Sequence, residues 1–175
     1  DHIKDIFWAS GAALFARREV YLKVGGLDES FFAHQEEIDL CWRILNEGHK
    51  IACIPQSIVY HLGGASLDKS RPKKTFLNFR NNLIMLLKNL PLYALPIIFT
   101  RLILDGLAGV KFMTEGKIIH SFAILKAHMS FYLKIPSTIM KRRKTAAISS
   151  KIKYKGSILI DYYLKGNKRF NDLNW

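Results

Sequence analysis

Residues 76–140 consist of long apolar stretches interrupted by isolated basic residues, and this pattern limits what the chain can fold into. The longest stretch without a charge in the middle of this region runs from Asn89 to Thr100, only 12 residues. A helix that crosses a membrane needs about 20 mostly apolar residues. The pattern therefore predicts no spanning segment, and it is typical of helices that lie at a membrane surface with an apolar side and a basic side.

The charge of the chain is divided unevenly between its two parts. Residues 1–68 contain 6 basic and 10 acidic side chains, a net charge of −4, and residues 69–175 contain 21 basic and 4 acidic ones, a net charge of +17. The run Lys141-Arg142-Arg143-Lys144 and scattered lysines up to residue 155 add a polybasic tail. We expect residues 76–175 to form a basic amphipathic helical region that binds an anionic membrane surface.

Other partners would also account for this basic region. A net charge of +17 suits nucleic acid, but the basic residues alternate with Leu, Ile and Phe runs and no nucleic-acid-binding motif occurs. We expect no nucleic acid partner. A helical bundle or a dimer interface would bury the same apolar faces, and the sequence leaves these two alternatives and the oligomeric state open.

The first 68 residues predict a mixture of strands and helices. The apolar run 6–16, broken at Ser10-Gly11, predicts a buried strand, and residues 50–54 and 57–60 predict two short strands. Residues 17–24 predict a short helix that ends at Gly25-Gly26. The sequence after residue 60 predicts a flexible loop at Gly63-Gly64-Ala65-Ser66.

Residues 34–46 show the clearest helical pattern. Apolar residues recur at helical spacing, at Ile38, Cys41, Trp42 and Leu45. With this spacing the apolar stripe of the helix would face a core. The charged residues of the helix, Asp39 and Arg43 among them, would lie on the opposite, polar side.

Cys41 and Cys53 are too few for a disulfide framework and show no CxxC spacing. Both lie in apolar surroundings, so we expect buried free thiols and a reducing compartment. No secretory signal peptide opens the sequence. These features predict a cytoplasmic protein that is peripheral at the inner face of the cell membrane.

Three segments carry a more specific pattern, WASGAALFARREV, VGGLDESFFAHQEEIDLCWRILNEGHKI and IPQSIVYHLGGAS. In this order and spacing they resemble the C-terminal half of the catalytic domain of glycosyltransferase family 2, in particular its rhamnosyltransferase-like bacterial branch, over about residues 6–68. The resemblance implies an α/β fold, with residues 1–75 as the acceptor-side half of a GT-A type domain, followed by the mostly helical basic region. It also implies inverting sugar transfer in surface polysaccharide or glycolipid synthesis.

The resemblance assigns the acceptor chemistry to the acidic pair of the predicted helix. Glu37 matches the position of the general base, which takes the proton of the acceptor hydroxyl, although the family usually has Asp there. Glu36 and Asp39 would orient this base or bind acceptor hydroxyls, and Arg43 would be an ion-pair partner or a phosphate contact. From the residues alone, an acidic run at a helix start is a solvated first turn that the helix dipole favours.

The resemblance also suggests a metal ligand and a sugar-binding wall. His61 corresponds to a ligand of the divalent metal, Mn²⁺ or Mg²⁺, that holds the nucleotide diphosphate; otherwise it is a structural histidine at a strand end. Trp8, Ser10 and Gly11 would line the acceptor or donor pocket, or Trp8 would be a core aromatic. Asp28 is expected to cap a turn.

No Asp-x-Asp motif and no Gly-rich phosphate loop occurs in the 175 residues. Enzymes of the family that it resembles bind the nucleotide through an N-terminal α/β half and hold the metal with an Asp-x-Asp motif. We therefore expect the donor-binding half to lie outside this sequence and the chain alone to be inactive. The expected substrates are a nucleotide-sugar donor and a glycan or lipid-linked acceptor.

Overall fold

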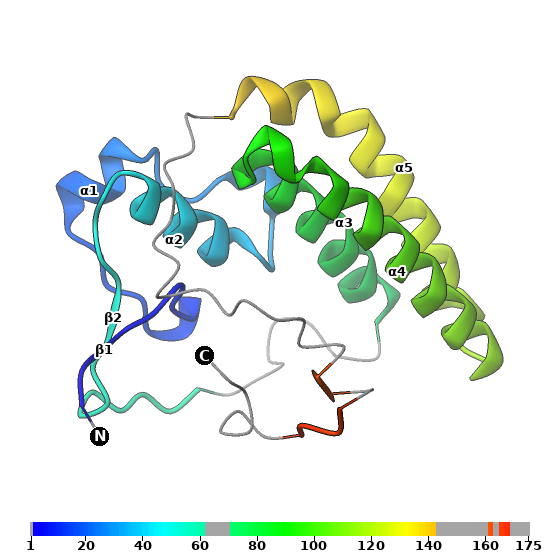
Figure 1. The fold of residues 1–175 in the computed structure, drawn as a ribbon, viewed down its shortest axis with the longest axis horizontal. Coiled ribbons are helices and arrows are strands. Elements are labelled where there is room, and N and C mark those ends of the chain that lie inside the picture. Colours follow the sequence, from blue (N-terminus) through cyan, green and yellow to red (C-terminus); the bar gives the residue numbers. More distant parts are fainter. Residues whose placement is uncertain (1, 62–70, 143–160, 163–164, 169–175) are drawn as a thin grey trace.

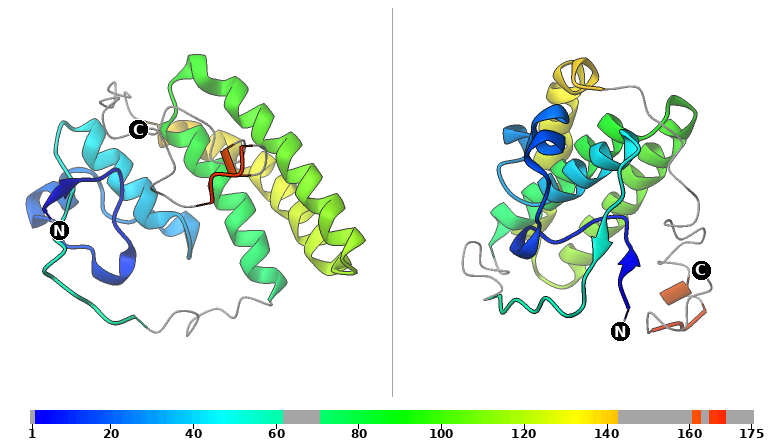
Figure 2. Two further views of the ribbon diagram at one scale, coloured as in Figure 1. Left: turned by 60° about the horizontal axis from the view of Figure 1, so that its bottom comes forward. Right: turned by 90° about the vertical axis from the view of Figure 1, so that its left-hand side faces the viewer.

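The structure is a computed structural model that describes residues 2–61, 71–142, 161–162 and 165–168 (Figure 1). Helices make up most of it. In chain order the elements are β1 (Lys4–Asp5), η1 (Gly11–Ala13), α1 (Arg18–Lys23), η2 (Glu29–Phe31), α2 (Glu36–Asn46), β2 (Ala52–Cys53), α3 (Pro72–Asn89), η3 (Leu92–Ala94), α4 (Leu95–Thr114) and α5 (Ile118–Met140). In Figure 1 and the left view of Figure 2, the strands lie at the end of the molecule away from α4 and α5.

The expected α/β class, an acceptor-side part of a GT-A type domain, is wrong for this structure. Within the described ranges the only sheet is the antiparallel pair β1–β2, which joins Lys4 to Cys53 and Asp5 to Ala52. Two-stranded pairs are marginal by themselves. A strand also needs hydrogen-bond partners for its backbone groups. In the apolar run 6–16, Ile6 N donates to Ile51 O at 2.9 Å, and residues 11–13 then form η1 instead of a strand.

The other secondary-structure predictions of the first part have mixed outcomes. Helices α1 and α2 confirm the two predicted helices, and Gly25 and Gly26 end α1 with φ of 83° and 62°. The predicted strand 50–54 is reduced to β2, and residues 57–60 form no strand. Cys41 is buried as expected, whereas Cys53 is exposed. The predicted Gly63–Ser66 loop and the basic residues 143–155 lie outside the described residues.

Helices α3, α4 and α5 pack side by side (Figure 1). Thr75 Oγ1 lies 2.7 Å from His120 Nδ1 and ties α3 to α5. Ser121 Oγ donates to Gly109 O at 2.7 Å and ties α5 to α4. The main core lies between α3 and its neighbours, and its largest buried members include Phe31, Trp42, Leu83, Ile84 and Phe131.

A buried carboxylate joins α2 to α3. Asp39 has no exposed surface, and its Oδ2 accepts from Arg43 Nε at 2.9 Å and from Lys88 Nζ at 2.9 Å. Its Oδ1 accepts from Asn89 Nδ2 at 2.8 Å. Both oxygens are therefore fully used within the protein. The predicted exposure of Asp39 and Arg43 is wrong, because helical periodicity assigns charged residues to solvent when no partner is known.

The same network extends to the α1–η2 connection and to the end of α5. Arg43 donates to the carbonyl oxygens of Val24 and, at 2.7 Å, of Gly26. Lys88 also pairs with Asp28, which in turn accepts from Lys141, each at 2.7 Å. Burial alone would raise the pKa of Asp28, but the hydrogen bonds from Lys141, Lys88 and Ser30 outweigh it and hold that pKa well below its usual value.

One helical stretch, Leu92–Thr114, is long and apolar enough to cross a membrane by its length and composition, and only 24% of its most apolar window is buried. Charges interrupt this stretch, and for that reason its sequence pattern predicts no spanning helix. In the structure two of these charges, Arg101 and Asp105, pair one helical turn apart at 2.7 Å, and Asp105 also lies 3.2 Å from His128 of α5. Lys111 is the other charged residue of the stretch, and it lies near its C-terminal end, 3.9 Å from Glu115.

We predict that Asp39→Asn destabilises the fold by about 3–5 kcal/mol, because it leaves Arg43 buried without a counter-charge and leaves Lys88 with Asp28 as its only carboxylate partner. Urea unfolding should show a lower midpoint with an unchanged slope. The matched control is Asp5→Asn, which removes an exposed pair with Lys50 and should cost less than about 1 kcal/mol. Equal stability of the two variants would contradict the role given to Asp39.

Candidate active site

A cavity of about 650 Å³ opens beside the first turn of α2. Its lining residues come from stretches of the chain as far apart as Ser10 and Lys74. Five of the residues singled out from the sequence line it: Ser10, Gly11, Glu36, Glu37 and His61. His34 and Lys74, which the sequence analysis did not select, line it as well. The cavity thus joins the start of η1, the start of α2 and the chain after β2.

The turn that leads into α2 has an uncommon backbone. Phe32, His34 and Gln35 have φ of 65°, 68° and 75°, in a region that non-glycine residues rarely occupy. Each such residue costs of order 1–3 kcal/mol, and conformations of this kind gather at functional sites, where surrounding contacts enforce them. The turn therefore requires contacts from elsewhere in the molecule.

Two neighbouring side chains of α3 supply these contacts. Asn81 is fully buried and its Nδ2 lies 2.9, 2.7 and 2.8 Å from the carbonyl oxygens of Phe31, Ala33 and His34. Arg80 donates to Phe31 O at 3.1 Å and to Asn81 Oδ1 at 2.9 Å, which fixes the orientation of the amide. Burial lowers the pKa of Arg80. Helix α3 thereby sets where α2 begins and where its first acidic residues point.

Three polar atoms beside this cavity have no protein partner. Within the part of the chain that the structure describes, Nε2 of His34, Oε2 of Glu36 and Oε2 of Glu37 are buried without a hydrogen bond. Buried polar atoms in folded proteins are nearly always hydrogen-bonded, to protein or to ordered water. A ligand with polar groups at this cavity would supply the partners that these three atoms lack.

The electrostatic surroundings differ between the acidic pair and the histidine. Burial raises the pKa of Glu37, and the adjacent carboxyl of Glu36 raises it further. Burial lowers the pKa of His34, and Lys74 adds to this effect while Glu36 opposes it. The cavity therefore favours a more basic Glu37 carboxylate beside a neutral imidazole, an arrangement suited to proton transfer.

The described residues do not form a metal centre. No group of three or more His, Cys, Asp or Glu side chains among them could hold a metal ion. His61 is exposed, and it lies in an irregular segment rather than at the end of a strand as predicted. Its expected role as a ligand of Mn²⁺ or Mg²⁺ needs partners that these residues do not supply.

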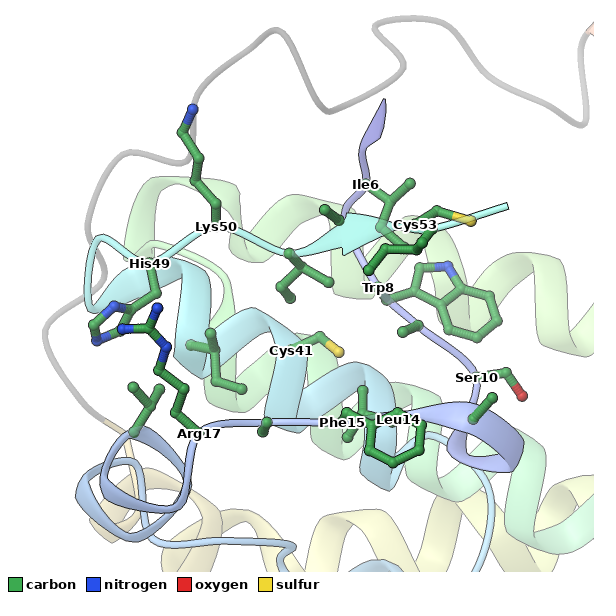
Figure 3. Close-up of a pocket in the computed structure, with 18 of the residues that line it drawn as sticks. Ile6, Trp8, Ser10, Leu14, Phe15, Arg17, Cys41, His49, Lys50 and Cys53 are labelled. Carbon is green, nitrogen blue, oxygen red and sulfur yellow. The ribbon is translucent and has the colours of Figure 1, made fainter. Parts of the chain in front are cut away.

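Trp8 belongs to a second cavity, of about 750 Å³, which Figure 3 shows. This cavity lies between β2, α2 and the chain before α1, and its walls are largely apolar. Ser10 lines both cavities, whereas Trp8, 44% exposed, lines only the second one. The structure therefore separates Trp8 from the Glu36–Glu37 pair, although the sequence analysis grouped it with Ser10 and Gly11.

Two more of the predicted substrate-binding residues lie away from the Glu36–Glu37 cavity. Asp39 and Arg43 are buried in the network that joins α2 to α3, with their hydrogen-bonding groups directed at protein atoms. Asp28 caps η2, as expected, since its Oδ1 accepts from Ser30 N at 3.0 Å.

No signal in the sequence identifies His34, because its place at the cavity depends on the turn that Asn81 stabilises.

The comparison with curated proteins finds two similar enzymes. Both are named N-acetylglucosaminyl-diphospho-decaprenol L-rhamnosyltransferase, from Mycobacterium tuberculosis strains CDC 1551 / Oshkosh and ATCC 25618 / H37Rv, and each is 34% identical over 58 residues. The match covers 33% of this chain and 19% of each relative. No family model matches the chain.

No solved structure matches the chain either. The similarity is therefore confined to a third of the chain and to less than a fifth of either relative. It relates that part of the sequence to a sugar-transferring enzyme, and this glycosyltransferase relatedness is the conclusion that the comparisons support.

Proposed function

We propose that this chain is the acceptor-side part of an inverting glycosyltransferase that uses a nucleotide-sugar donor in surface polysaccharide or glycolipid synthesis. The observation that carries the proposal is the cavity at the start of α2, where Glu36, Glu37 and His34 present buried polar atoms without protein partners. The partial similarity to rhamnosyltransferases supports the same chemistry. A donor-binding half that carries the nucleotide and metal sites would complete the enzyme.

In this proposal Glu37 is the general base. Its carboxylate accepts the proton of the acceptor hydroxyl while that oxygen attacks the anomeric carbon of the donor sugar and the nucleotide diphosphate leaves. A raised pKa strengthens the base, since a more basic carboxylate holds the proton more firmly. Glu36 and neutral His34 would hold the acceptor by hydrogen bonds.

A second proposal concerns where the protein acts. Helices α4 and α5 each carry exposed apolar residues four positions apart, Phe99, Ile103 and Leu107 on α4 and Leu125, Met129 and Leu133 on α5. Soluble monomers rarely leave apolar surface of this extent uncovered. We propose that these stripes dock on an anionic membrane surface, with the basic residues at the lipid head groups, at the inner face of the cell membrane. The same stripes also fit the alternative function, in which the chain is a non-catalytic module that binds an anionic membrane surface.

We predict that Glu37→Gln lowers sugar transfer by at least about 10²-fold, because it removes the base and keeps the size of the side chain. The assay follows transfer of labelled sugar from a nucleotide sugar by the polypeptide that includes the donor-binding half. Binding of the nucleotide sugar should stay nearly unchanged. Glu19→Gln, the same change at an exposed position of α1, is the control, and equal turnover of both variants would remove Glu37 from the mechanism.

The pH dependence of transfer gives an independent test. The base acts in its deprotonated form, so kcat/KM should rise with pH through the raised pKa of Glu37. Glu36→Gln removes the neighbouring carboxyl that contributes to this raised pKa and should move the acid limb to lower pH. An acid limb that does not move in Glu36→Gln would show that Glu36 does not set the titration of the base.

Membrane docking predicts binding to liposomes that strengthens with anionic lipid and weakens with salt without vanishing, since apolar insertion is not screened. Leu107→Ser and Leu133→Ser should weaken the binding, whereas Leu22→Ser, an exposed leucine on α1, should not. Indifference to anionic vesicles at low salt would contradict docking. Retention in the membrane after carbonate extraction would instead indicate a spanning helix.

A further inference from the structure

A groove of about 680 Å³ lies between the first half of α3 and the first half of α5, with Phe32 at its edge. This volume falls within the range of ligand pockets in proteins. Its wall is mainly apolar and includes Phe76 of α3 and Ile119 and Phe122 of α5. Phe32, Ile119 and Phe122 are 71%, 67% and 65% exposed, so the groove presents large apolar side chains directly to solvent.

Three cations lie on the aromatic rings of this groove. Lys73 Nζ is 4.7 Å from the centroid of the Phe32 ring. Arg80 Cζ and Lys126 Nζ lie 5.1 and 5.9 Å from the centroid of one ring, that of Phe76. Cations favour such positions over ring faces, and the rings thereby hold three positive charges in one place.

No carboxylate lines the groove to balance these charges. Arg80 is directed at the carbonyl oxygens of Ser30 and Phe31, but Lys73 and Lys126 form no ion pair with any residue that the structure describes. The first turn of α3 has no acidic residue, so the positive end of the helix dipole adds to the same potential. The groove is therefore complementary to an anion of more than one charge.

The apolar wall and the cations together specify an amphiphilic ligand. A free anion would leave Phe122 and Ile119 exposed, and an uncharged hydrocarbon chain would leave the three like charges unbalanced. We propose that this groove binds a phosphate-bearing lipid, with its head group at Lys73 and Lys126 and its hydrocarbon chain along Phe32, Ile119 and Phe122. Phosphate monoesters carry close to two negative charges at neutral pH, which suits the groove better than a carboxylate does.

The groove and the cavity of the candidate active site are lined by neighbouring residues of the chain. Phe32 and Lys73 line the groove, whereas His34 and Lys74, one or two residues further on, line the cavity. A lipid-linked acceptor could thus extend from one to the other, and this last step rests on the proposed function. Lipid binding in the groove does not depend on it.

The test is a calorimetric titration of the full chain with dodecyl phosphate below its micellar concentration, at low salt. Lys73→Gln/Lys126→Gln should weaken binding at least about ten-fold, and Phe122→Ala should weaken it as well. The matched control Lys4→Gln/Lys50→Gln removes two exposed lysines that do not line the groove and should bind as the unaltered chain does. Circular dichroism checks that all variants keep their helices.

Three results would overturn the proposal. Equal binding by the groove and control variants would place the ligand elsewhere. Equal affinity for inorganic phosphate would indicate a simple anion site, and equal affinity for uncharged dodecyl maltoside would indicate a non-specific apolar surface. Glu37→Gln should bind dodecyl phosphate normally, so a failure of the proposed catalytic role leaves this measurement unaffected. Leu107→Ser should also bind normally, which separates the groove from docking on a bilayer.

Discussion

The Asp39 carboxylate is the interaction on which the arrangement of the described helices depends. It is buried without exposed surface and accepts from Arg43 on its own helix and from Lys88 and Asn89 on α3. A buried charge is tolerated only when its partners are in place. Helix α2 therefore has one position against α3, and the segments that Arg43 and Lys88 contact, the α1–η2 connection and Asp28, are fixed with it.

This constraint explains why the site lies where it does. Helix α3 contacts the chain before α2 a second time, through Arg80 and Asn81, which donate to the carbonyl oxygens of Ser30, Phe31, Ala33 and His34. One helix thus fixes both the middle of α2 and the turn that precedes it. The first turn of α2, with Glu36 and Glu37, is held between these two contacts, and its carboxyl groups face the cavity rather than open solvent.

Sequence reasoning succeeded where local patterns decide the structure. The spacing of apolar residues and the glycines after residue 24 predicted α1 and α2, and Asp28 could be recognised as a cap from its neighbours. It failed where distant partners decide. The apolar run 6–16 predicts burial but not a strand partner, and Asp39 appears solvent-exposed until Lys88, 49 residues later, is placed beside it.

The candidate site was predictable only in part for the same reason. The order of short motifs pointed to Ser10, Gly11, Glu36, Glu37 and His61, and these line one cavity. Trp8 and Arg43 lie elsewhere, because their surroundings depend on packing rather than on order along the chain. Sequence reasoning could not identify His34, because the positive φ of a histidine produces no pattern in the composition or in the spacing of apolar residues.

The turn from Phe32 to Gln35 has a consequence for how the protein folds. Its backbone is unfavourable by itself, and the amide that holds it comes from Asn81, nearly 50 residues away. Closing a loop of that length has to precede the stabilising contact. A chain in which α2 has formed but α3 has not yet docked would therefore contain Glu36 and Glu37 on a helix without the cavity beside them. The acidic pair becomes part of a site only when α3 docks, so its assembly reports on tertiary docking rather than on helix content.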